Sequence, residues 1–73
     1  MPRTYFYVVP VAQGWALRGG AFAGRNLYET REEALREARR MAVGLFTVAQ
    51  RPTGVRLQVG LDAWEDCELF GEM

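Results

Sequence analysis

The alternation of apolar and polar residues predicts strands on both sides of one central helix. Residues 5–10 form an apolar run rich in aromatic and β-branched side chains, which is typical of a strand. Residues 55–59 alternate cleanly, with three apolar side chains on one face and two polar ones on the other. Together with glycine-rich and proline-containing breaks, the pattern predicts strands over residues 5–10, 15–18, 25–29, 46–50 and 55–59.

The helix has the clearest local signal in the chain. Thr30 and Glu33 form a capping box, in which the hydroxyl accepts the backbone N–H three residues later and the carboxylate reaches back. Gly44 is the predicted end of the helix. One helical face then carries the apolar residues Ala34, Leu35, Ala38, Ala42 and Leu45.

This element order, β-β-(β)-α-β-β, predicts an α+β fold with a small antiparallel sheet and one helix packed on one face. The first strand is apolar on both sides: Phe6 and Val8 point one way, and Tyr5, Tyr7 and Val9 point the other. A single helix covers only one side of a sheet. We therefore expect the second side to meet the C-terminal tail, another subunit or a ligand.

The composition lacks several of the residue types that carry catalysis and metal binding. The 73 residues include no His, Ser or Lys, which supply most catalytic bases and nucleophiles, so we predict that the protein is not an enzyme. One Cys, Cys67, allows no internal disulfide and no zinc cluster, so we expect a cytoplasmic protein without metal or cofactor. Acids on both sides of Cys67 disfavour its thiolate. No apolar run is long enough to span a membrane.

The net charge of zero hides an uneven distribution of charge. Residues 1–60 carry nine Arg and four Glu, a net charge of +5, whereas residues 61–73 carry five acids and no base. We predict a compact domain over residues 1–60 and an acidic C-terminal tail over residues 61–73 that docks on the domain or on a partner. Leu61, Trp64, Leu69 and Phe70 give this tail apolar contacts to make.

Several motifs resemble those of a known family. Residues 7–10 read Tyr-Val-Val-Pro, residues 14–18 read Gly-Trp-Ala-Leu-Arg, and a Thr-capped helix follows at Thr30. This arrangement, over about residues 5–59, resembles the small bacterial proteins grouped as domain of unknown function family 2188. The resemblance implies a small β-β-α-β-β domain with no assigned activity, and it implies no site residues. Thr53-Gly54 stands where that family usually has Asp-Gly.

Aromatic and basic residues make up the candidate interaction surface. Tyr5 and Tyr7 are spaced like sheet aromatics that stack nucleobases, although an aromatic face packed against the tail or a partner explains them as well. Trp15 is either a stacking platform or a core anchor. The full candidate set is Tyr5, Tyr7, Trp15, Arg18, Arg25, Arg56, Trp64 and Phe70.

Two functions fit this surface. The first is a non-catalytic interaction module that binds itself as a homo-oligomer, or binds another protein, through the aromatic sheet face or an unpaired edge strand. The alternative is a nucleic-acid-binding domain that uses Arg and the sheet aromatics and is modulated by the acidic tail.

Overall fold

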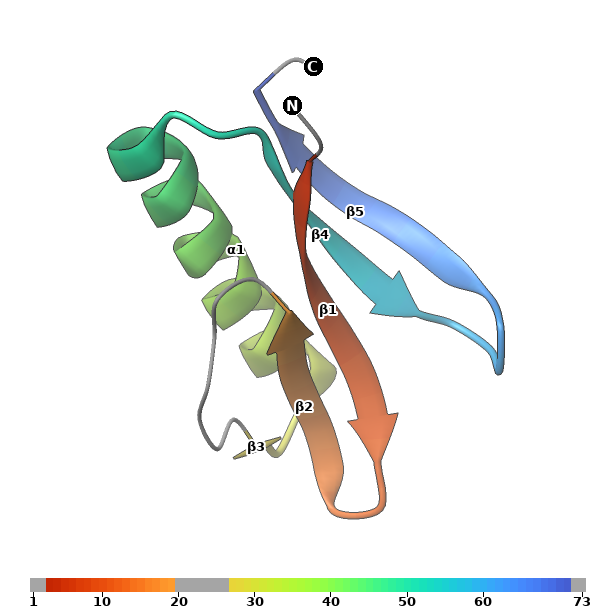
Figure 1. The fold of residues 1–73 in the computed structure, drawn as a ribbon. Coiled ribbons are helices and arrows are strands. Elements are labelled where there is room, and N and C mark those ends of the chain that lie inside the picture. The colour runs from red at the N-terminus through yellow and green to blue at the C-terminus, as the bar shows by residue number, and fades with distance from the viewer. Residues whose placement is uncertain (1–2, 20–26, 72–73) are drawn as a thin grey trace.

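One helix packs on one face of a five-stranded sheet in the computed structural model, which describes residues 3–19 and 27–71 (Figure 1). This arrangement confirms the predicted α+β class and the single helix on one face. The elements in chain order are β1 (Thr4–Val11), β2 (Gly14–Gly19), β3 (Leu27–Tyr28), α1 (Arg31–Ala49), β4 (Thr53–Gln58) and β5 (Trp64–Phe70).

The sheet is mixed, whereas the sequence pattern predicts an antiparallel one. Its strand order is β3-β2-β1-β4-β5, and the central strand β1 runs parallel to its neighbour β4. The other three pairs are antiparallel. The reason is the length of α1, whose 19 residues rise about 28 Å and carry the chain back along the whole sheet. The chain therefore enters β4 at the end where β1 also begins, as in any helical crossover between parallel strands.

The helix begins as predicted. The Thr30 hydroxyl accepts the Glu33 N–H at 3.1 Å, which is the predicted N-cap bond, and the Glu33 carboxylate reaches back to accept from the Thr30 hydroxyl at 3.2 Å.

The predicted end at Gly44 and the predicted strand over residues 46–50 are both wrong, because α1 continues to Ala49 and ends at Gln50 in the left-handed conformation. Gly44 lies on the solvent side, where its missing side chain costs the helix little contact. Leu45 continues the stripe of side chains packed against the core, and this packing outweighs the strand preference of residues 46–48.

The remaining boundaries shift by one or two residues. Pro10 does not end β1, since the strand continues to Val11 and pairs with β2 down to the turn. Of the predicted third strand, Leu27–Tyr28 is a strand in the described residues, and its predicted beginning, including Arg25, lies outside them. Strand β4 begins two residues earlier than predicted.

The acidic segment contributes a full strand to the sheet. Strand β5 pairs antiparallel with β4 along its length. Most of the predicted tail therefore extends the edge of the sheet and does not lie over the sheet face opposite α1. A β-bulge interrupts the pairing, because Val55 faces Glu68 while the next residue, Arg56, faces Asp66. Cys67 is the extra residue of this bulge.

The core between helix and sheet is small. Three alanines of α1 are fully buried, and they let the helix lie close to the strands. Thr53 is the buried polar residue of this core, and its hydroxyl donates to the Ala42 carbonyl at 2.8 Å. The sheet contributes the apolar side chains of Phe6, Val8, Leu17, Val55 and Leu57.

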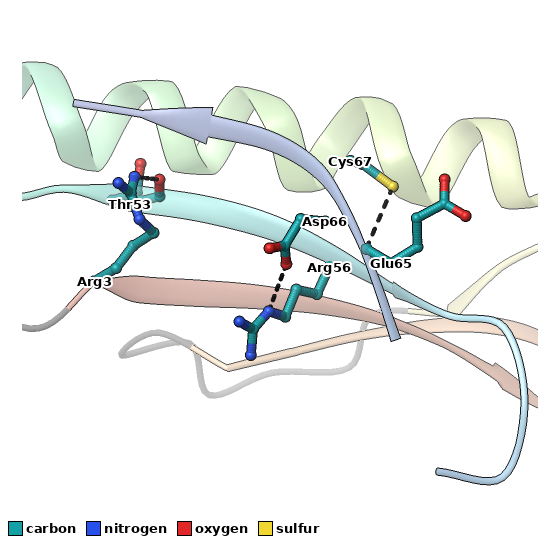
Figure 2. Close-up of polar contacts among 6 residues, drawn as sticks. All are labelled: Arg3, Thr53, Arg56, Glu65, Asp66 and Cys67. Carbon is teal, nitrogen blue, oxygen red and sulfur yellow. Dashed lines mark hydrogen bonds and ion pairs between the residues drawn. The ribbon is translucent and has the colours of Figure 1, made fainter. Parts of the chain in front are cut away.

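Arg3 ties the start of the chain to its end. Its guanidinium donates to the carbonyls of Thr53 at 2.8 Å, Phe70 at 3.0 Å and Gly71 at 3.0 Å. Figure 2 shows Arg3 reaching from the beginning of β1 to Thr53 on β4. Charged hydrogen bonds of this kind are stronger than neutral ones, so Arg3 holds the ends of three strands together.

Arg3→Ala should lower the free energy of unfolding by about 2 kcal/mol, because three carbonyls lose a charged donor. Urea denaturation measures this loss, and hydrogen exchange should show that the amides of β5 lose protection first. Arg3→Lys is the matched control, since an ammonium keeps the charge but not the planar fork and should recover only part of the loss. Equal stability of wild type and Arg3→Ala would contradict this role.

Candidate interaction face of the sheet

The face of the sheet opposite α1, called here the open face, carries aromatic and charged side chains. It is covered by no other helix or strand among residues 3–19 and 27–71. Strand pairing places alternate residues of β1, β2, β4 and β5 on this side. These residues are Tyr5, Tyr7, Val9, Val11, Ala16, Arg18, Arg56, Gln58, Trp64, Asp66 and Leu69, and the pairing of β3 with β2 adds Leu27.

Three aromatic rings lie in contact on the open face. The centroids of Tyr5 and Tyr7 on β1 are 6.1 Å apart, and the Tyr7 ring meets Trp64 of β5 edge-on at 5.2 Å. Trp64 is 45% exposed although it is the largest side chain of the group. A half-exposed Trp supported by a neighbouring ring is already held in place to contact another molecule.

Arg56 links the aromatic rings to the acidic strand. Its guanidinium lies 3.7 Å from the centroid of the Tyr5 ring, a cation–π contact, and its Nε donates to Asp66 Oδ1 at 2.6 Å (Figure 2). The hydrogen bond to Asp66 is the main reason why the pKa of Arg56 is raised above its ordinary value. Arg56 is therefore a fixed part of the surface, with its charge balanced by Asp66.

A shallow hollow of about 420 Å³ lies beside the aromatic rings. Val9, Trp64 and Arg18 from β2 are among the residues that line it. Arg18 is exposed and makes no ion pair with another described residue. The hollow thus has an apolar base with one cation available to an incoming group.

The structure brings together five of the eight predicted site residues, namely Tyr5, Tyr7, Arg18, Arg56 and Trp64. Trp15 and Phe70 instead pack against the core on the helix side. Strand pairing explains their position, since Trp15 lies opposite Pro10 and Phe70 lies opposite buried Thr53. Arg25 lies outside the described residues.

Sequence reasoning missed Asp66 and Leu69 as members of this face. The two residues are three apart and would alternate to opposite sides in a regular strand. The bulge at Cys67 resets the alternation and brings both to the open face, where Leu69 lies beside Tyr5 over Gly54. The period-two pattern of the sequence already puts Val9 on the side of Tyr5 and Tyr7, and Gln58 on the side of Arg56, although neither is in the candidate set.

The helix side of β5 carries a second link between acid and base. Arg39 of α1 donates from Nε to the Glu68 carboxylate, with the nitrogen 2.9 and 3.0 Å from its two oxygens. With Arg56–Asp66, this pair joins the acidic strand to two arginines of residues 1–60. Exposed ion pairs of this kind each contribute little to the free energy of folding, so the pairing of β5 with β4 does not depend on them.

Within the described ranges, no group of three His, Cys, Asp or Glu side chains gathers closely enough to hold a metal ion. Nor does the helix seen there have the length and apolarity needed to cross a membrane. Cys67 points to the helix side of the sheet, and its thiol lies 3.9 Å from the Glu65 carbonyl oxygen. Desolvation first, and then the charges of Glu65, Asp66 and Glu68, raise the pKa of this thiol.

Because its pKa is raised, Cys67 should become a thiolate only at higher pH than a free cysteine, whose pKa is about 8.5. The rate of alkylation by iodoacetamide, measured against pH, should therefore rise later than that of a free cysteine derivative. Glu65→Gln should move the profile part of the way back, whereas Asp62→Asn should leave it in place. A profile at or below that of the free thiol would contradict the predicted direction.

Comparison with known proteins gives no relative: no family model, curated protein or solved structure matches this chain. The resemblance to family 2188 therefore stays a prediction.

Proposed function

We propose that the protein is a non-catalytic interaction module that self-associates through the open face of its sheet. The observation that carries this proposal is the aromatic group of Tyr5, Tyr7 and Trp64 on a sheet face that no other described element covers. Apolar surface of this kind on a small protein usually marks an interaction site. The acidic segment, one of the covers expected from the sequence, lies at the sheet edge instead.

The small core supports association with a second chain. The helix contributes only alanine side chains to the fully buried set, so the monomer buries little apolar volume for its length. Burial of further apolar surface stabilises by roughly 25 cal/mol per Å². Covering the open face would supply this burial, which short chains often obtain from a second subunit.

The dimensions of the protein also suit a dimer. Its Cα extents are 34 × 23 × 18 Å, and in a two-layered protein the shortest of these runs across the layers. The product of the other two extents is close to the roughly 800 Å² that each partner buries in a standard interface.

The sheet edges support association less well than the face does. The described part of β3 has two residues, and β5 presents Glu65, Asp66 and Glu68 next to the bulge at Cys67. Two copies of β5 side by side would bring like charges together. Acids and bulges on edge strands are devices that prevent pairing between copies.

The alternative occupant of the open face is single-stranded nucleic acid. Arg18, which has no ion-pair partner among the described residues, and the exposed ring of Trp64 favour it, since phosphates bind Arg and bases stack on aromatic rings. Arg56 favours it less, because Asp66 already balances its charge. The face as a whole therefore suits an apolar partner better than a polyanion.

Sedimentation of the full chain from low to high micromolar concentration tests the proposal. We expect the mass to rise towards twice the 8.3 kDa of one chain. Trp64→Ser should raise the dissociation constant at least about 30-fold, the cost of losing an interface hot spot. Val48→Ser is the matched control, since Val48 is 85% exposed on α1 and this change should leave the mass unaffected.

A mass of one chain at all concentrations would overturn self-association. A labelled single-stranded RNA oligonucleotide, titrated at low salt into the same samples, examines the alternative. Binding that weakens with salt and is lost in Trp64→Ser, by a protein that stays monomeric, would assign the face to nucleic acid instead. Deleting residues 61–73 would not serve as a test of the acidic segment, because the deletion would remove β5 from the sheet.

A further inference from the structure

Residues on the open face lie in rows across the sheet, and two of these rows are self-complementary. Strand pairing puts Arg18, Tyr7, Arg56 and Asp66 at one level, in the order β2, β1, β4, β5. The row therefore begins with a cation on β2 and ends with an acid on β5. A surface with opposite charges at its two ends can match a rotated copy of itself.

The next row towards the β1–β2 turn is self-complementary in the size of its side chains. Val9 pairs with Ala16, and Gln58 pairs with Trp64, while Val9 and Gln58 follow the paired residues Val8 and Leu57. The row therefore has a small side chain on β2 and the largest one on β5. The hollow lined by Val9, Arg18 and Trp64 lies over these two rows.

From these rows we infer that two chains pair face to face about a two-fold axis that runs parallel to the strands, between β1 and β4. The inference rests on the proposed self-association through the open face. Such a rotation keeps each row at its level and lays β2 of one copy over β5 of the other. Arg18 then meets Asp66 of the second copy, and Ala16 meets its Trp64, each contact occurring twice.

The contacts within one chain leave the Arg18 guanidinium and one oxygen of the Asp66 carboxylate available for a contact between the two copies. Arg56 Nε bonds to Asp66 Oδ1, which leaves the second carboxylate oxygen for the second copy's Arg18. Arg18 is exposed and has no ion-pair partner among the described residues of its own chain. Sheets pack about 10 Å apart, a distance that an Arg and an Asp side chain span together when they point towards each other.

A two-fold axis across the strands fits less well. It would lay β5 over β5 and gather the acids of the two copies, and it would lay β2 over β2 and leave both Arg18 side chains without an acid. Like charges placed opposite each other cost affinity and act against that arrangement. The distribution of charge and the distribution of size therefore favour the same axis.

Charge exchange between two variants tests this arrangement. Arg18→Asp should weaken the dimer at least about tenfold, because each copy then sets two acids against each other, and Asp66→Arg should do the same with two cations. An equimolar mixture of the two variants should regain the dimer mass, as a heterodimer with both contacts restored. Arg36→Asp is the matched control, since it makes the same change of charge on α1 and should have no effect.

Ala16→Trp gives a second test that leaves the Arg56–Asp66 pair intact. It fills the place that the second copy's Trp64 would occupy, and it should therefore reduce the dimer at least about 30-fold while circular dichroism stays that of the folded protein.

A wild-type protein that remains monomeric would overturn both the proposed function and this arrangement. A wild-type dimer that tolerates Arg18→Asp as well as Arg36→Asp, or that tightens in Ala16→Trp, would overturn the arrangement alone. The arrangement alone would also be overturned if the mixture of Arg18→Asp with Asp66→Arg stayed monomeric while Ala16→Trp left the dimer intact.

Discussion

The parallel pairing of β1 with β4 is the contact on which the rest of the structure depends. Neither strand lies at an edge of the sheet, and from one side they bury Phe6, Val8, Val55 and Leu57 against the helix. The same backbone pairing sets the register of the opposite side, where Tyr7 stands beside Arg56. Core and open face are therefore two sides of one pairing, and a shift of one residue would exchange them.

The parts of the fold that could be predicted are those determined by neighbouring residues. The cap at Thr30 and the alternation in β1 and β4 are local patterns, and the structure contains all of them. The end of the helix could not be read in this way, because residues 46–48 have strand preferences that packing of α1 on the sheet overrides. The parallel direction of β4 follows from a contact between distant residues, on which local preference has no influence.

The candidate site shows the same division. Tyr5 and Tyr7 share a strand and a face, so the period of two was enough to group them. Trp64 and Asp66 join them only through the pairing of β5 with β4, whereas the sequence predicts a docked tail and gives no strand or register that would place these residues. The structure explains that composition in part, since Asp66 and Glu68 each pair with an arginine from earlier in the chain. The uneven distribution of charge along the sequence is thus partly neutralised where the segments meet.

The bonds from Arg3 to the carbonyls of Phe70 and Gly71 bring the first and last described residues to the same end of the sheet. A short peptide bridge between Arg3 and Gly71 would therefore suffice to close the described part of the chain into a covalent ring without disturbing either face. Such a ring has fewer unfolded conformations than the open chain, so the closed molecule would be stabilised through its denatured state. New ends opened at the β1–β2 turn would then yield a circular permutant with the same sheet.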